Sequence, residues 1–170
     1  MAKEFSLGGD GQSLANQAVS LVFLNPAATP APEFLVFRLW ASQQGSATSA
    51  QQRIQAEYQR SPYPTLVSAT PAHLKTGDTV ASLIVGATTG SIGTGGINAS
   101  AEGAGAKSTI WGDNFNMLNG YLWVATPREV ISMAPGNTAS GTEAGLGLFL
   151  PAAATSLSNW AMGMNYGEDI

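Results

Sequence analysis

The chain has 170 residues, of which 44% are hydrophobic and only 11% charged, and its formal net charge is −4. This length is enough for one domain with a sizeable core. The 7 basic residues are scattered, so we expect no nucleic-acid partner, because phosphate contacts need clustered Lys and Arg. The absence of cysteine excludes disulfides, thiolate metal sites and a cysteine nucleophile. No run approaches eighteen apolar residues, so we expect no membrane partner either.

The low charge density indicates a surface that other subunits cover. The charged fraction is less than half of the roughly 25% that is usual in globular proteins. A folded chain of this mass exposes roughly 7,900 Å², which leaves one charge per roughly 400 Å². One interpretation is a moderately soluble monomer rich in small residues. We favour the other, a subunit covered by partners, since obligate interfaces are depleted of charge.

The chain is predicted to begin with an arm. Residues 1–17 are polar and Gly-rich, so we predict a flexible N-terminal arm that Phe5 and Leu7 anchor on a neighbour. Residues 18–170 are predicted to form a single β-sandwich domain. The first residues contain no long apolar core of the signal-peptide kind, so we expect synthesis and folding in a cytoplasm.

The first two strands are predicted at residues 18–24 and 34–42, with a Pro-rich loop between them. The second strand presents two apolar faces. One face is uninterrupted and consists of Leu35, Phe37, Leu39 and Ala41. The other carries one charge among large apolar groups and consists of Phe34, Val36, Arg38 and Trp40. We expect a loop or another subunit to cover this second face.

Residues 51–60 fit two periodicities. In a strand, Ile54, Ala56 and Tyr58 would face inward, whereas in a helix Ala50 would join Ile54 and Tyr58 in one stripe. We favour the strand because the alternation fits every position. Further strands are predicted at residues 65–68, 79–86, 107–111, 146–150 and 157–166.

Two segments stand out from this pattern. Residues 87–106 are so rich in glycine that we predict a long loop, which in a compact domain is usually functional or docked on something. Residues 120–133 indicate two strands, or one strand with a corner at Pro127, and their nearly continuous apolar character predicts burial on two faces. The whole pattern gives eight to ten strands and at most one short helix. We therefore predict an all-β fold, a β-sandwich or jelly roll with long Gly-rich loops.

No constellation of residues indicates catalysis or metal binding. His73 is the only histidine, and it lies in a predicted loop with no nucleophile elbow nearby. Only carboxylates remain as metal ligands, and none has calcium-loop spacing. Residues 90–96 lack the Gly-Lys-Ser/Thr end of a phosphate-binding loop. We predict no enzyme, no cofactor and no metal, with a carboxylate pair for glycoside hydrolysis as the remaining enzymatic alternative.

Four tryptophans leave a carbohydrate-binding module as another alternative, because aromatic rings can form a sugar platform. They are Trp40, Trp111, Trp123 and Trp160. All four lie in predicted strands, so we favour packing in the core or in an interface.

Three stretches resemble a recurring pattern in small virion proteins of tailed bacteriophages. They are residues 98–107 (NASAEGAGAK), residues 115–127 (FNMLNGYLWVATP) and residues 148–153 (LFLPAA). The resemblance implies a β-sandwich subunit that decorates and cements a capsid from its outer surface through non-covalent contacts, usually as a dimer or trimer. It implies the major capsid protein or other virion subunits as partners, and a family without catalytic residues. A tail or baseplate component is the alternative.

The contact surface is predicted on two parts of the chain. Phe34, Val36 and Trp40 represent the second face of residues 34–42, and Ile92 and Ile97 represent the Gly-rich loop. Apolar and backbone contacts spread over a large interface would hold the subunit in place.

Overall fold

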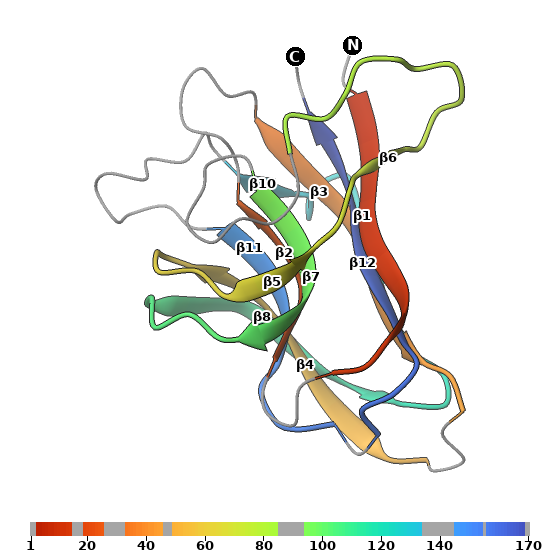
Figure 1. The fold of residues 1–170 in the computed structure, drawn as a ribbon, viewed down its shortest axis with the longest axis vertical. Helices are drawn as coiled ribbons and strands as arrows, with labels where there is room; N and C mark the ends of the chain where they lie inside the picture. The colour runs from red at the N-terminus through yellow and green to blue at the C-terminus, as the bar shows by residue number, and fades with distance from the viewer. Residues whose placement is uncertain are drawn as a thin grey trace.

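The computed structural model describes residues 3–14, 19–25, 33–45, 49–84, 94–133, 145–154 and 156–168. These residues form twelve strands and no helix, arranged as two six-stranded antiparallel sheets (Figure 1). The sheets pack as a β-sandwich and do not close into a barrel, so the predicted fold class is confirmed. No helix long and apolar enough to cross a membrane occurs in the described ranges.

Sheet I follows the order β10-β3-β12-β1-β6, and β9 also pairs with β3 on the β10 side. Its strands are β1 (Lys3–Gln12), β3 (Phe34–Gln43), β6 (Ala72–His73), β9 (Tyr121–Val124), β10 (Ile131–Met133) and β12 (Trp160–Glu168). Sheet II follows the order β5-β7-β2-β11-β4-β8. Its strands are β2 (Val19–Asn25), β4 (Gln51–Gln59), β5 (Thr65–Ser68), β7 (Thr94–Ala101), β8 (Lys107–Asn116) and β11 (Gly145–Leu150).

The strand order is that of a jelly roll with an insertion. From β1 to β4 the chain alternates between the sheets, and β11 and β12 each lie between two of these earlier strands. The resulting orders, β1-β12-β3 with the β9–β10 edge and β2-β11-β4-β8, are the two-sheet wrapping of a jelly roll. The insertion supplies β5, β6 and β7, which extend the far edges of both sheets.

The predicted N-terminal arm is wrong for residues 3–12, which form β1 in the interior of sheet I. β1 pairs with β12 along its length and with β6 on the other side. Phe5 and Leu7 alternate with small or polar residues, and both are fully buried in the protein's own core. This strand needs glycine at position 8, because a Cβ there would lie 2.6 Å from the Met162 carbonyl oxygen. Residues 1, 2 and 15–17 of the predicted arm lie outside the described residues.

A β-bulge in β3 corrects the predicted faces of that strand. Val36 pairs with Tyr166 and Arg38 with Asn165, so Phe37 is an extra residue on β3. A bulge of one residue reverses the side on which the following residues point. Phe34 and Val36 therefore face the core together with Leu39 and Ala41, and all four are fully buried. The prediction of Phe34 and Val36 as contact surface is wrong.

The Gly-rich segment contains a regular strand, contrary to the prediction of a loop. Residues 94–101 form β7, which lies between β2 and β5. Ile97 is only 4% exposed, so its prediction as a surface contact is wrong, whereas Ile92 lies outside the described residues. Glycine is required at position 95, because a Cβ there would lie 2.7 Å from Leu7 and 2.8 Å from Ile84. The strand predicted at residues 79–86 is wrong for residues 79–84, which are not in a strand.

Residues 120–133 form two strands, as predicted, on one edge of β3. β9 pairs with Arg38–Ala41 and β10 with Phe34–Val36, and a turn closed by the Glu129 amide on the Thr126 carbonyl separates them. The expected burial on two faces is wrong. Tyr121, Ile131 and Met133 face the core, whereas Leu122 and Val124 face solvent.

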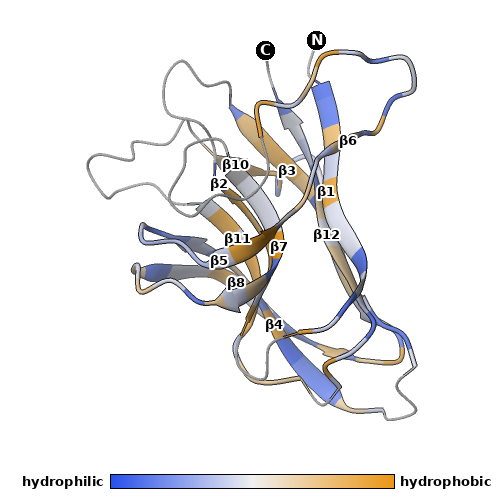
Figure 2. Cartoon of the chain, in the orientation of Figure 1, coloured by the Kyte–Doolittle hydropathy of each residue, from blue (hydrophilic) through white to orange (hydrophobic). Residues whose placement is uncertain are grey.

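The core lies between the sheets, where Figure 2 shows hydrophobic residues concentrated in β2, β3 and β11. A row of rings crosses the inner face of sheet I. The ring centres of Phe34 and Tyr166 are 5.9 Å apart, those of Tyr166 and Phe5 5.7 Å, and those of Phe5 and His73 4.9 Å. This row joins four neighbouring strands, β3, β12, β1 and β6.

β8 is the longest free edge among the described strands, and it carries two protective features. A bulge at Ile110 interrupts its pairing with β4. The Asp113 carboxylate accepts the Asn114 amide hydrogen at 2.7 Å, which removes a free donor. Both features hinder the addition of a foreign strand.

Candidate interaction site

The outer face of sheet I carries the tryptophan of the predicted contact strand, which is half-buried. Trp40 pairs with Leu122, and Arg38 pairs with Val124, across β3 and β9. Because Leu39 and Ala41 point into the core, these four side chains point outward. We call Arg38, Trp40, Leu122 and Val124 the tryptophan face.

Glycines on the neighbouring strands form the floor on which Trp40 lies. A Cβ on Gly163 of β12 would lie 2.5 Å from Trp40 Cη2, and one on Gly8 of β1 would lie 3.2 Å from Trp40 Cζ2. The indole therefore extends from β3 across β12 towards β1. Such a position is available only because both residues beneath it lack a side chain.

Arg38 lies over the indole ring. Its guanidinium carbon lies 5.5 Å from the centre of the Trp40 ring, within the range of a cation–π contact. The three ion pairs of the described residues involve Lys3 and Lys107 and leave Arg38 without a carboxylate partner. The tryptophan face is thus apolar with one uncompensated positive charge.

Leu122 and Val124 complete the face on β9. They are 58% and 57% exposed, the two highest values among the large hydrophobic residues of the described chain. The outward positions of an antiparallel sheet are usually polar. Two such side chains beside a tryptophan indicate a surface that favours contact with another molecule.

A buried amide lies on the same side of the sheet. Asn165 pairs with Arg38 on one side and with Ser6 on the other, and it is 7% exposed. Its Oδ1 has no hydrogen-bond partner among the described residues.

Of the four predicted contact residues that the structure describes, Trp40 alone lies on this surface. Arg38 was expected on the same face of the strand, and the structure places it there. Sequence reasoning missed Leu122 and Val124, because their apolar neighbours suggested a strand buried on two faces. Pro127 was the available signal, since proline within an apolar run favours an edge strand, which leaves one face open.

Of the other three tryptophans, Trp160 is buried and Trp111 and Trp123 are partly buried against the core. Trp160 is fully buried, and its Nε1 donates to the Ser156 carbonyl at 2.8 Å. Trp111 of β8 and Trp123 of β9 contact each other with ring centres 4.8 Å apart, and Trp111 Nε1 donates to the Tyr121 hydroxyl at 2.9 Å. This pair bridges the two sheets on the side where β8 and β9 form the edges.

A polar cluster fastens residues 79–84 to the end of β12. Ser82 Oγ lies 2.8 Å from the Tyr166 hydroxyl and donates to Glu168, and the Leu83 amide donates to both Glu168 oxygens at 3.1 Å. Glu168 is fully buried, and this burial raises the pKa of its carboxyl. Its oxygens are taken by these donors, so the cluster serves to hold the segment rather than to bind a substrate.

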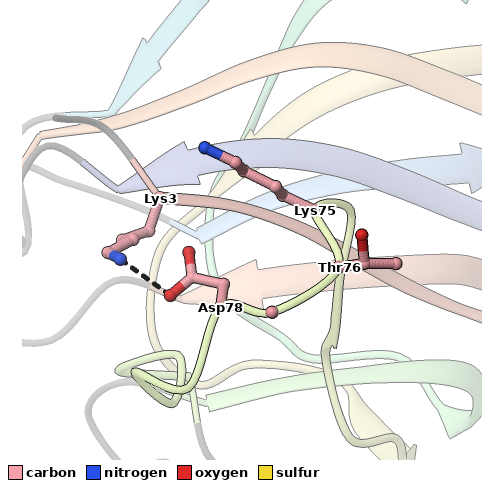
Figure 3. Close-up of a pocket in the computed structure, with 5 residues that line it drawn as sticks. Lys3, Lys75, Thr76 and Asp78 are labelled. Atoms are coloured by element: carbon pink, nitrogen blue, oxygen red, sulfur yellow. Dashed lines mark hydrogen bonds and ion pairs between the residues drawn. The ribbon is translucent and has the colours of Figure 1, made fainter.

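A shallow pocket lies near this cluster and is shown in Figure 3. The Lys3 Nζ donates to Asp78 Oδ1 at 2.7 Å, and this hydrogen bond lowers the pKa of the Asp78 carboxyl. Lys75 points away from this ion pair. Because its carboxylate is already paired with Lys3, the pocket offers no free acid for catalysis.

Two carboxylates meet on the outer face of sheet II. Lys107 Nζ lies 3.4 Å from Glu57 and 3.1 Å from Glu102, and Glu102 also accepts the Ser20 amide at 2.5 Å. Glu57 is 3% exposed, and burial raises its pKa. A lysine bridges the pair and Glu57 is closed to solvent, so the arrangement lacks the open cleft that glycoside hydrolysis needs.

No group of three or more His, Asp or Glu side chains within the described ranges could hold a metal ion. His73 packs against Phe5 at the edge of sheet I, without a serine hydroxyl as hydrogen-bond partner among the described residues. The described side chains thus form no recognisable catalytic or metal centre.

Comparison with known proteins found no match: no family model, no curated protein and no solved structure matches this chain.

Proposed function

We propose that this protein is a structural subunit of a bacteriophage virion, which decorates and stabilises the capsid through non-covalent contacts made by the tryptophan face. The observation that carries the proposal is the exposure of Leu122 and Val124, at 58% and 57%, beside Trp40. A surface of this kind gains free energy when a partner removes it from water.

The size of that gain supports an interface. Full burial of a leucine or valine side chain contributes about 1.5–3 kcal/mol. With more than half of each side chain still exposed, covering Leu122 and Val124 would contribute about 2–3 kcal/mol in total. The charge of −4 on 170 residues and the low charged fraction also suit a surface covered by neighbours.

The fold is compatible with this role. Jelly rolls occur in viral capsid proteins, but also in lectins and cupins, so the topology by itself assigns no function. The resemblance of residues 98–107 and 115–127 to small phage virion proteins favours the capsid role. The proposed partners are the major capsid protein or other virion subunits, including further copies of this chain, at the outer surface of the virion.

The geometry of Trp40 counts against the carbohydrate-binding alternative. A sugar platform needs an indole face open to solvent. Arg38 lies over the Trp40 ring, the edge of the indole lies against Gly163 and Gly8, and the side chain is half-buried. The remaining tryptophans are buried or packed against each other.

Co-sedimentation tests the proposal. Purified protein is mixed with undecorated capsids and, separately, with isolated tails, and the bound fraction and the heat resistance of the particles are measured. Leu122→Ser with Val124→Ser should weaken capsid binding at least about tenfold, which corresponds to the loss of about 1.4 kcal/mol or more. Leu74→Ser is the matched control, because Leu74 is 43% exposed but lies after β6 at the opposite edge of sheet I.

Capsid binding that the double substitution leaves unchanged would reject the tryptophan face as the contact. Absence of binding to capsids together with binding to tails would move the protein to the tail, and absence of both would reject the virion role.

A further inference from the structure

The charge of the tryptophan face specifies the chemistry of its partner. Arg38 is the one charged residue of this face, and Trp40, Leu122 and Val124 surround it with apolar surface. Any molecule that covers the apolar groups must also cover the guanidinium or leave it at the rim.

Arg38 lies next to the indole before a partner arrives. Its guanidinium carbon is 5.5 Å from the centre of the Trp40 ring, and Trp40 itself lies on the glycine floor. A guanidinium has five N–H donors in a fixed planar arrangement that matches the two oxygens of a carboxylate. No carboxylate of the described residues occupies those donors.

A partner without an anion would bind poorly. Covering Arg38 with an apolar surface would remove water from an unpaired charge, and this costs more than the neighbouring apolar contacts return. We propose that the tryptophan face binds a protein surface that presents a carboxylate among apolar side chains, and that Arg38 pairs with this carboxylate. The inference rests on the proposed function in one respect, that this face is the interface.

The same charge disfavours a two-fold dimer through this face. In a two-fold contact each residue of the patch meets the same patch of the second copy. An axis through the tryptophan face would bring two Arg38 side chains close together, without an acid on the face to separate them. The partner is therefore a different surface, which supplies the acid.

A pair of small ligands tests this selection. 2-Naphthylacetate combines an aromatic ring with a carboxylate, and 2-naphthylacetamide replaces the carboxylate with a neutral group of the same shape. Each is titrated into isotope-labelled protein, and the amide shifts of Leu122 and Val124 and the indole shift of Trp40 are followed. The wild-type protein should bind the carboxylate roughly fivefold more tightly than the amide, as expected for one partly exposed charge-assisted hydrogen-bonded pair.

Two variants with the same change in net charge distinguish direct pairing of the ligand with Arg38 from long-range electrostatic attraction. In Arg38→Gln the fivefold preference should fall to about one, with binding of the amide changed less than about twofold. Arg53→Gln is the control, because Arg53 is exposed on β4 of sheet II, and it should keep the preference.

Several outcomes would overturn the inference. Equal binding of the two ligands by the wild-type protein, or an equal loss of preference in both variants, would show that Arg38 does not select a carboxylate. Shifts confined to other parts of the protein would show that the face is not a binding surface. A wild-type dimer that Leu122→Ser with Val124→Ser abolishes would show that a second copy occupies the face.

The outcome of the capsid experiment is independent of the outcome of the ligand titration. Selective binding of the carboxylate ligand, without binding to capsids or tails, would leave the partner chemistry standing and reject the virion role. Capsid binding that Arg38→Gln leaves unchanged would support the virion role and reject the pairing of Arg38 with a carboxylate.

Discussion

The glycine floor beneath Trp40 gives a sharp prediction about stability. In Gly163→Ala the new Cβ would lie 2.5 Å from Trp40 Cη2 and 2.7 Å from the Leu7 carbonyl oxygen. The indole can move outward, but the carbonyl belongs to a paired strand and moves little. Overpacking of this kind costs about 1–3 kcal/mol, and the backbone contact places this case at about 2–3 kcal/mol.

A double-substitution cycle divides that cost between the two contacts. In a Trp40→Ala background the clash with the indole is gone and the clash with Leu7 remains, so Gly163→Ala should then cost about 1 kcal/mol. The expected coupling between positions 40 and 163 is about 1–2 kcal/mol. Urea denaturation of the four proteins measures it, and for a chain of this size the single variant should also unfold about 4–12 °C lower.

Gly112→Ala is the control, because a Cβ at position 112 would have its nearest contact at 3.4 Å from Gln55, an ordinary separation. It should change the free energy of unfolding by less than about 1 kcal/mol, since alanine in a strand costs no more than glycine. Equal costs of Gly163→Ala with and without Trp40 would refute the described position of the indole. A cost below about 0.5 kcal/mol would refute the close packing itself.

Three further predictions concern the core, the buried acids and the edge. Phe34→Ala should destabilise the fold by about 3–5 kcal/mol and Leu122→Ala by less than about 1 kcal/mol in chemical denaturation, because one side chain is fully buried and the other 58% exposed; similar losses would contradict the burial of Phe34. Burial raises the pKa of Glu57 and Glu168 above 4.5, so the folded state binds protons more tightly than the unfolded chain. The free energy of unfolding should therefore fall as the pH rises through their folded pKa values, and Glu57→Gln and Glu168→Gln should each flatten this fall in urea midpoints measured from about pH 5 to about pH 8; a steeper fall would reverse the assigned direction. Asp113→Ala frees an amide on β8 and should increase self-association in light scattering relative to Asp113→Asn, which keeps an acceptor; equal behaviour would show that the carboxylate does not protect the edge.

The regular part of the fold was predictable from periodicity. β2, β4 and β11 lie within a residue or two of the predicted strands, because alternating or continuous apolar runs report directly on burial. The strand interpretation of residues 51–60 is confirmed by β4, where alternation at every position outweighed the competing helical stripe.

Glycine explains the largest misses. β1 and β7 contain Gly8 and Gly95, which a sequence shows only as flexible residues. In the folded protein both glycines are strand residues. Glycine is needed at these positions because Met162, Leu7 and Ile84 approach too closely for a Cβ. That requirement comes from elements distant in the sequence, so no local pattern could reveal it.

The candidate site was only partly predictable for a related reason. The sequence shows that residues 34–42 have two apolar faces, but not that a bulge at Phe37 divides each face between core and solvent. Trp40 and Arg38 were found because they follow the bulge. Leu122 and Val124 required knowledge that β9 is an edge strand, which is a property of the assembled sheet.

The positions of β11 and β12 determine when the protein can fold during synthesis. β11 lies between β2 and β4, and β12 lies between β1 and β3, so each of these two strands leaves the ribosome after both of its neighbours. Until then four earlier strands lack a neighbour, and their exposed backbone can pair with other nascent chains. The sandwich therefore cannot be completed before β12 has been synthesised, and chaperone binding in this interval would raise the yield of soluble subunits.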